Sequence, residues 1–273
     1  MTTSQASSPS NLLSQVDQIR TQLTGTGAPF ERITVNVHGH NYLAYRNAFP
    51  NLPALINAGR AHGPREFMVY ENERWTFDRF FQQVDALAAN LQHQLGVKAG
   101  DRVAIAMRNR PEWAVAFAAI SLVGAVPAPL NSYGLHDELM ANLVDLQPKL
   151  LICDPERFAR VQNDLAALSC KAMVVDGTAQ QGEASWQAMT SASTTAHQTP
   201  ELLSTDPALV LFTSGASSQA KAVLSSHMAV CQALFNIDFI GAISAMTSPK
   251  AIELMMAKAL QPTTLTAVPL FHV

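Results

Sequence analysis

The sequence predicts an α/β fold built on a mostly parallel sheet with helices on both faces. Strand-like and helix-like segments alternate along the chain, which is the order that produces such a sheet. The strand-like segments are continuous apolar runs, as expected for strands that are buried on both faces. Of the 273 residues, 48% are hydrophobic, so one large domain or two modest ones can enclose a core.

The first part of the chain leads from a polar tail into regular structure. Residues 1–11 predict a disordered tail, and 12–273 predict part of one large domain. Directly after the tail, leucine, valine and isoleucine recur at helical spacing and predict a short amphipathic helix. A longer helix follows, with Thr76 as its N-cap and Gly96 as its C-terminal stop.

The remaining elements alternate between strand and helix. The pattern predicts strands at 102–107, 125–130, 149–154, 172–176 and 207–213, and helices from Pro111 to Gly124, over 137–146 and after Pro155. Residues 177–206 are rich in Ser, Thr, Ala and Gln and predict a linker or surface excursion. Residues 238–262 predict extra helix or an irregular insertion, to which we assign no function.

Composition excludes several classes of protein. The net charge of −3 provides no basic field for a nucleic acid backbone, and the eight histidines do not cluster at metal-ligand spacing. Three cysteines, odd in number and in apolar surroundings, predict buried reduced thiols in a cytoplasmic protein. The start of the chain has no signal-peptide pattern. The apolar stretch 113–130 contains Gly124, Pro127 and Pro129, so it predicts a buried helix and strand and no transmembrane segment.

The stretch "FTSGASSQAKAVLSSH", residues 212–227, gathers hydroxyl side chains and one lysine on a short loop. Hydroxyls, backbone N–H groups and a mobile cation together favour a phosphate, with an ordinary polar turn as the alternative. A P-loop does not fit, because Ala220 stands where its second glycine belongs and Ala222 where its magnesium-binding hydroxyl belongs. "AVL" after Lys221 also favours a strand over the helix that a P-loop requires.

Longer segments resemble a known family. "RWTFDRFFQQVDALAANL", "GVKAGDRVAIAMRNRPEWAVAFAAISLVGAVPAPLN" and "DELMANLVDLQPKLLICD" occur in this order, with the Thr-Ser-Gly loop after them. Together they resemble the N-terminal region of the adenylate-forming (AMP-binding) superfamily, which includes acyl-CoA synthetases, peptide-synthetase adenylation domains and luciferases. The resemblance runs from Leu52 to Val273.

The resemblance implies that the loop binds the phosphates of ATP. The family loop reads TSGTTGxPKG, and the implied phosphate-binding residues here are Thr213, Ser214, Gly215, Ala216, Ser217, Ser218 and Lys221. The chain departs from that pattern, since Ala216 lacks a hydroxyl, Ser218 and Ala222 replace glycines, and Ala220 replaces the proline. If position 218 needs a positive φ, serine costs on the order of 1 kcal/mol there, so the departures put the affinity for ATP in question.

Two further segments have family counterparts. "VPLFHV", which we predict to be an apolar strand, resembles the segment that lines the acyl pocket. The resemblance implies Phe271 and His272 as acyl-pocket residues, with Phe271 beside the acyl chain and His272 also the catalytic residue. "LSSH", ending at His227, predicts helix capping by Ser225 or Ser226. The residues around Asn109, namely Asn109, Arg110, Glu112 and Trp113, are interpreted as architecture.

The family joins a carboxylate to ATP, and many members pass the acyl group to coenzyme A. The resemblance therefore implies a small-molecule carboxylate, ATP and CoA as substrates, with Mg²⁺ held mainly by a glutamate motif further along the family sequence. We find no counterpart of that motif, of the ribose-binding aspartate or of the small C-terminal domain with its lysine, so we expect a truncated chain that is inactive alone. Exposed apolar sheet edges would then favour a homo-oligomer.

Three hypotheses follow for the function. The first is the N-terminal portion of an acyl-CoA synthetase-like ligase, for example in fatty acid metabolism. The second is a non-catalytic binding or interaction module derived from that family, favoured by the altered loop. The third is a P-loop phosphotransferase, which requires a helix beginning at Lys221.

Overall fold

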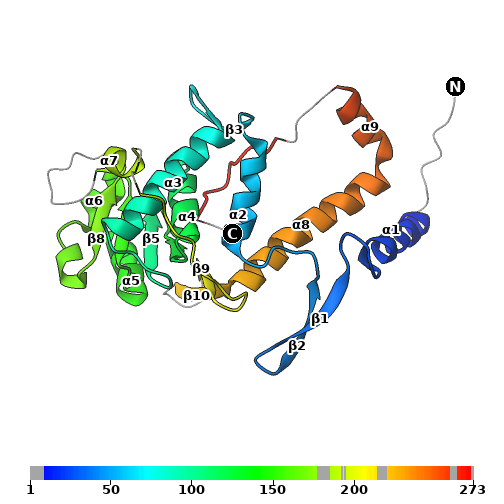
Figure 1. Ribbon diagram of the computed structural model, residues 1–273, viewed down its shortest axis with the longest axis horizontal. Coiled ribbons are helices and arrows are strands. Elements are labelled where there is room, and N and C mark those ends of the chain that lie inside the picture. Colours follow the sequence, from blue (N-terminus) through cyan, green and yellow to red (C-terminus); the bar gives the residue numbers. More distant parts are fainter. Residues whose placement is uncertain are drawn as a thin grey trace. The chain divides into compact units, whose positions relative to one another are not determined.

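The computed structural model describes residues 9–176, 185–191, 193, 195–213, 220–258 and 263–271. Within them the chain forms two compact units. Unit 1 comprises Met1–Phe49 and Cys231–Leu265, and unit 2 comprises Pro50–Val230 and Thr266–Val273. Each unit is considered by itself below, with its elements labelled as in Figure 1.

Unit 2 contains the alternating elements that the sequence predicts. Its helices are α2 (Leu52–Ala58), η1 (Gly59–His62), α3 (Phe77–His93), α4 (Pro111–Leu122), α5 (His136–Leu146), α6 (Pro155–Val161), η2 (Leu165–Leu168) and α7 (Trp186–Thr190). Its strands are β3 (Glu66–Tyr70), β4 (Glu73–Thr76), β5 (Arg102–Ala106), β6 (Val126–Pro129), β7 (Leu150–Cys153), β8 (Lys171–Val174), β9 (Pro207–Thr213) and β10 (Lys221–Ser226).

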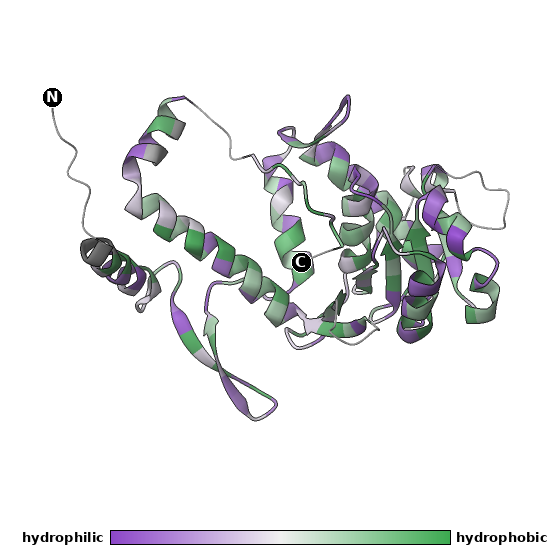
Figure 2. Ribbon diagram, turned by 180° about the vertical axis from the view of Figure 1, so that it is seen from behind, coloured by the Kyte–Doolittle hydropathy of each residue, from purple (hydrophilic) through white to green (hydrophobic). Residues whose placement is uncertain are grey.

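The centre of unit 2 is a four-stranded parallel sheet in the order β6-β5-β7-β8. Alternate residues of β5 enter two different cores: Val103 and Ile105 pack with α3 and α4, whereas Ala104 and Ala106 pack with α5 and α6. All four side chains are buried, and hydrophobic colouring predominates in the strands at the centre of this unit in Figure 2. The predicted α/β class, with helices on both faces of a parallel sheet, is confirmed.

Helix ends follow the signals in the sequence. Thr76 caps α3, where its hydroxyl accepts the Arg79 N–H at 3.1 Å. Gly96 follows α3 with a φ of 63°, and Gly124 follows α4 with a φ of 73°, a backbone region that glycine adopts without strain. Within the stretch 177–206 the structure adds α7, which the sequence did not indicate. Its Trp186 is buried in the core that α3 and α4 share.

Strands β9 and β10 pair with each other in an antiparallel hairpin and are not hydrogen-bonded into the parallel sheet. Strand β9 lies beside β6, and its Val210 joins the core under α5 and α6. Because Lys221 begins a strand, the P-loop hypothesis, which requires a helix there, is wrong. The run Ala222–Leu224 continues that strand with an apolar, partly β-branched sequence, as expected from it.

The predicted strand in "VPLFHV" is not formed. Residues 263–271 contain no helix or strand, and the last two residues of the chain lie outside the described part. No strand forms because this segment is hydrogen-bonded to the side chain of Asn109 and not to the backbone of another strand.

Unit 1 has its own small core. It contains α1 (Pro9–Thr24), the antiparallel pair β1 (Arg32–Val37) and β2 (His40–Tyr45), most of α8 (His227–Thr247), and α9 (Pro249–Ala257). Ile19 and Leu23 of α1 and Phe239 of α8 are buried together, with the rings of Phe30 and Tyr45 packed against them. The predicted extra helix in 238–262 is confirmed by the end of α8 and by α9.

One helix has the length and apolar composition of a membrane span, and the sequence analysis did not indicate it. The apolar stretch 113–130 forms α4 and β6, both buried as predicted. In the described part of the chain, α8 is the helix that is long and apolar enough to cross a membrane, judged by length and composition only.

Candidate functional site

The β9–β10 hairpin brings together the two ends of the predicted phosphate loop. Thr213 closes β9 and Lys221 opens β10, and the two residues are paired in the register. The Thr213 hydroxyl donates to the Lys221 carbonyl at 3.5 Å, and both side chains are exposed. Ser214, Gly215, Ala216, Ser217 and Ser218 lie outside the described residues, so their role stays a prediction.

His227 is buried and hydrogen-bonded to the backbone, as expected for a residue with a structural role. Its side chain is 2% exposed, and its Nδ1 accepts the Leu52 N–H at 3.2 Å. Burial lowers the pKa of His227, and the nearby Asp206 offsets this shift in part. The neutral ring therefore joins α2 to the start of α8. Ser226 accepts the Ala229 N–H at 3.2 Å, which confirms the predicted capping by one of the two serines.

The carboxyl ends of β5 and β6 form a second part of the site, where parallel α/β sheets generally bind ligands. A hollow of about 190 Å³ lies here, lined by Arg108, Asn109, Ser132, Tyr133, Ala267 and Pro269. The Arg108 guanidinium stacks over the Tyr133 ring at 3.8 Å from its centroid. The Tyr133 ring in turn meets the Phe271 ring edge to face, with 6.1 Å between centroids. His272 lies outside the described residues.

The loop that carries Tyr133 is anchored from α6. Arg157, whose side chain is 3% exposed, donates from Nε to the Ser132 carbonyl at 2.6 Å and pairs with Asp154 at 3.2 Å. Arg160 donates to the Gly134 carbonyl. Asp154 also accepts the Arg108 N–H at 3.2 Å, so one buried carboxylate connects the ends of β5 and β7 with α6. This network holds the rim of the hollow in place.

The ion pairs of Arg110 and Glu112 agree with the interpretation of these two residues as architecture. Arg110 pairs with Glu112 and with Asp176, each at 2.7 Å. Burial of the guanidinium opposes its charge, but the two carboxylates outweigh burial and raise the pKa of Arg110. The pairs tie the start of α4 to the end of β8.

Sequence reasoning missed Tyr133 and the contacts of Asn109. Tyr133 lies in the loop just after β6, so the rule that ligands bind beyond the carboxyl ends of parallel strands could have drawn attention to it. No local signal could have shown that Asn109 contacts residues 268 and 270, because that contact joins distant parts of the chain.

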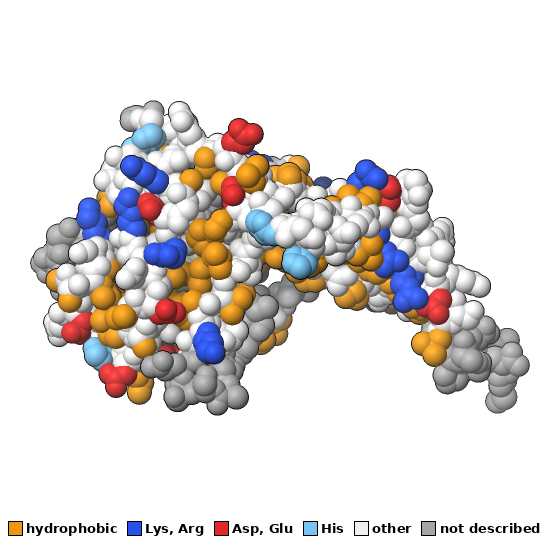
Figure 3. Space-filling view, turned by 90° about the horizontal axis from the view of Figure 1, so that it is seen from below, with side chains coloured by type: hydrophobic (Ala, Val, Ile, Leu, Met, Phe, Trp, Pro, Cys, Tyr) orange, Lys and Arg blue, Asp and Glu red, His pale blue; other side chains and the backbone are white. Residues whose placement is uncertain are grey.

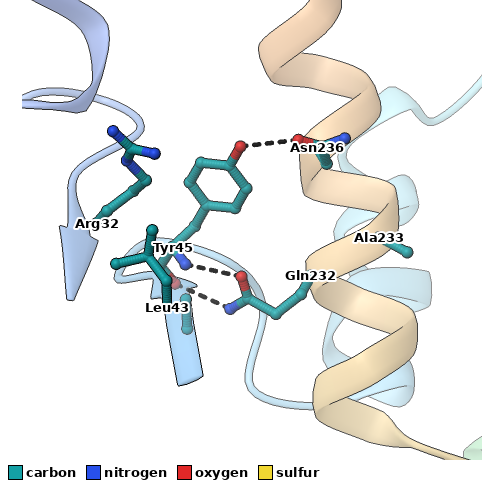
Figure 4. Close-up of a pocket in the computed structure, with 7 residues that line it drawn as sticks. Arg32, Leu43, Tyr45, Gln232, Ala233 and Asn236 are labelled. Atoms are coloured by element: carbon teal, nitrogen blue, oxygen red, sulfur yellow. Dashed lines mark hydrogen bonds between the residues drawn. The ribbon is translucent and has the colours of Figure 1, made fainter. Parts of the chain in front are cut away.

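A separate hollow of about 400 Å³ lies in unit 1 (Figure 4). Gln232 of α8 donates to the Tyr45 carbonyl at 3.0 Å and accepts the Tyr45 N–H at 2.7 Å. The Tyr45 hydroxyl donates to Asn236 at 2.8 Å, and burial raises the pKa of Tyr45. None of the predicted site residues lines this hollow.

Among the described residues, we find no further site marked by clustered charge or by metal-ligand groups. On the face shown in Figure 3, basic and acidic side chains are interspersed, in keeping with the net charge of −3. In the described part of the chain, no group of three or more His, Cys, Asp or Glu residues is arranged to hold a metal ion.

Comparison with curated proteins identifies relatives of known name. A crotonobetaine/carnitine–CoA ligase of Salmonella paratyphi B is 29% identical over 195 residues, covering 68% of this chain and 34% of the relative. The protein of that name from Escherichia coli is 28% identical over 206 residues, covering 73% of this chain and 37% of the relative. The chain thus spans roughly a third of the length of these curated relatives.

Solved structures agree with the sequence comparison. A putative long-chain-fatty-acid CoA ligase from Rhodopseudomonas palustris superposes with a TM-score of 0.63 at 26% identity, covering 83% of this chain and 53% of that chain. An anthranilate CoA ligase in complex with anthranoyl-AMP gives a TM-score of 0.61 at 18% identity, covering 66% of this chain and 35% of that chain, and shows the shared fold.

The family comparison covers both parts of the site. The model of the family described as AMP-binding enzyme matches residues 55–273, which include the β9–β10 hairpin and the rim of the hollow at β5 and β6. Because this match covers most of the chain, the chain belongs to the AMP-binding enzyme family.

Proposed function

We propose that this chain is the N-terminal portion of an ATP-dependent carboxylate–CoA ligase that activates an acyl substrate as its adenylate. The observation that carries the proposal is the β9–β10 hairpin inside the family match, because it sets a hydroxyl and a lysine at the two ends of the loop that resembles TSGTTGxPKG. The relatives named as CoA ligases support a ligase with CoA as its second substrate.

The proposed reaction has two steps. A carboxylate oxygen of the substrate attacks the α-phosphorus of ATP, the bond to the β-phosphate oxygen breaks, and acyl-adenylate and pyrophosphate form. The sulfur of CoA then attacks the acyl carbonyl, its proton is lost to solvent, and AMP leaves. Negative charge develops on phosphate oxygens in the first step, so cations and N–H donors around them lower the barrier. Lys221 and Thr213 are proposed to supply part of that environment.

Magnesium is implied by the family, but the described residues do not form a site for it. No step is therefore assigned to a metal-binding residue of this chain, and main ligands further along the family sequence remain a prediction. His272 remains the proposed catalytic residue and Phe271 the proposed acyl-pocket residue. The three cysteines are buried, and the proposed location is the cytoplasm.

The test of the function is carboxylate-dependent exchange of labelled pyrophosphate into ATP by the 273-residue chain. The panel contains fatty acids, aromatic acids and carnitine, and direct ATP binding is measured in parallel by calorimetry. We expect ATP to bind and exchange to stay at background for the chain alone. Exchange above background would show that the chain is active by itself, and the acid that supports it would identify the substrate.

The alternative is a binding module derived from the same family, and the altered loop at Ala216, Ser218, Ala220 and Ala222 favours it. This alternative predicts that ATP does not bind measurably. An absence of ATP binding would therefore contradict the ligase proposal for this chain. The state of association, which we propose to be a homo-oligomer, is measured on the same sample by light scattering.

A further inference from the structure

Asn109 makes two hydrogen bonds to one backbone segment on the far side of the sequence. Its Nδ2 donates to the Val268 carbonyl at 2.9 Å, and its Oδ1 accepts the Leu270 N–H at 2.8 Å. Both ends of the amide are used, and the two partners are residues i and i+2 of the same segment. A residue of a neighbouring parallel strand would form the same two bonds, one to a carbonyl and one from the N–H two residues later. Here the side chain of Asn109 takes the place of that residue.

The amide fixes the register of residues 268–270. The segment has no helix or strand of its own, so a shift by one residue would not be resisted by a ladder of backbone hydrogen bonds. Asn109 resists such a shift because both its hydrogen bonds, to the Val268 carbonyl and from the Leu270 N–H, must break before the segment can move. The side chain of Leu270, the last residue of this segment, packs against the hydrophobic core of unit 2.

The fixed register determines where Phe271 lies. The Phe271 ring contacts Tyr133, and Tyr133 lies under the guanidinium of Arg108, the residue before Asn109. The rim that carries Tyr133 is anchored independently by Arg157, which donates to the Ser132 carbonyl. Two fixed points, one at the end of β5 and one after β6, therefore hold Phe271 against Tyr133, which lines the hollow.

We propose that Asn109 is a positioning residue for acyl recognition: through Val268 and Leu270 it sets the place of Phe271 at the acyl end of the site. The proposal rests on the proposed function, because it takes the segment 268–271 as part of the acyl pocket. Asn109 itself does not touch the substrate. It acts through the segment that it holds, so its removal affects the acyl part of a ligand and leaves the nucleotide part alone.

The experiment compares two kinds of ligand on the full 273-residue chain. Benzoyl- and decanoyl-sulfamoyl-adenosine, which are stable mimics of acyl-adenylates, carry both parts of the ligand, and AMP carries only the nucleotide. Their dissociation constants are measured by calorimetry for the wild type, Asn109→Ala, Asn109→Asp and a control. The control is Asn47→Ala, because the Asn47 amide also donates to a backbone carbonyl, that of Pro29 at 2.9 Å, in unit 1.

We expect Asn109→Ala to weaken binding of the tighter acyl-adenylate mimic by up to about thirtyfold, the ceiling set by the loss of two neutral hydrogen bonds, while AMP binding changes little. Asn47→Ala leaves both ligands unchanged. Hydrogen exchange of the Leu270 amide should accelerate in Asn109→Ala, which shows directly that the segment has been released.

Asn109→Asp separates positioning from mere packing by its pH profile. The ionised carboxylate can accept the Leu270 N–H but faces the Val268 carbonyl without a proton, whereas the protonated form can donate to it. A carboxyl group facing a carbonyl oxygen has a pKa above about 3.9, so affinity for the mimic should recover as the pH falls from about 7.5 to about 5. The wild type should show no such recovery relative to AMP.

Two results would overturn the inference. If the wild type binds the mimics more tightly than AMP and Asn109→Ala retains that difference, Asn109 does not position the acyl site. If the variant weakens AMP and mimic by the same factor, its effect is one of general folding. A wild type that binds neither ligand rejects the proposed function itself, and the inference is rejected with it.

Discussion

Thr213 and Lys221 face each other across the β9–β10 hairpin, and the hydroxyl of Thr213 donates to the carbonyl of Lys221. The backbone of Lys221 thus closes the hairpin, while its side chain is exposed and available to a ligand. Lys221→Ala should therefore weaken ATP binding by about tenfold, as expected for one charge-assisted hydrogen bond, without changing the unfolding midpoint. Calorimetric titration with ATP and urea unfolding check the two parts.

The control for Lys221 is Lys171→Ala, which removes an exposed lysine from the amino end of β8. Ligands of parallel sheets bind at the opposite end, so this variant should bind ATP as the wild type does. Unchanged ATP affinity in Lys221→Ala would remove the hairpin from the nucleotide site.

Arg157 and Asp154 form a buried pair whose loss should be costly. The side chains are 3% and 9% exposed, and Arg157→Met leaves the carboxylate of Asp154 without its cation. We expect the free energy of unfolding to fall by about 3 kcal/mol, as for other buried pairs that lose one partner. The matched variant is Arg74→Met, whose pair with Glu66 is 68% and 51% exposed and should cost less than about 1 kcal/mol. Equal costs in urea unfolding would disprove the role of burial.

His227 should make stability depend on pH. Burial lowers its pKa in the folded state, so below the unfolded pKa of about 6.5 the unfolded chain binds more protons at this site. Stability from this residue is therefore complete above about pH 6.5 and is lost below it, by at most about 1.4 kcal/mol per pH unit. His227→Gln should show a smaller fall in urea midpoint than the wild type between pH 7.5 and 5.5. The same fall in both proteins would show that other groups cause it.

Gly124 should tolerate no side chain, for two separable reasons. Its φ is 73°, and an added Cβ would lie 2.5 Å from Cγ of Pro200. Gly96 has a similar φ of 63° but no atom within 4 Å of an added Cβ. Gly96→Ala should thus cost about 1 kcal/mol for the backbone alone, and Gly124→Ala about 2–4 kcal/mol because overpacking adds to it. Thermal unfolding of both variants measures the difference, which should vanish if Pro200 moves aside freely.

Much of the fold could be predicted because burial on two faces constrains composition. Strand β5 lies between two cores, so every residue from Val103 to Ala106 must be apolar, and such a run is readable without a structure. The β9–β10 hairpin was predictable for a related reason, since the β-branched and apolar residues after Lys221 suit a strand and not a helix. The phosphate site stays a prediction: Thr213 and Lys221 lie at the two ends of the loop, and Ser214–Ser218 and His272 lie outside the described residues.

The sequence by itself determined the alternation of elements, the two-sided burial of the parallel sheet and the strand that begins at Lys221, because these depend on local propensity and on apolar runs. Tertiary structure alone decided that residues 263–271 form no strand, that α7 packs into the core, and that Asn109 holds Val268 and Leu270. An apolar run predicts burial, but whether it becomes a strand depends on which donors and acceptors the rest of the fold brings beside it.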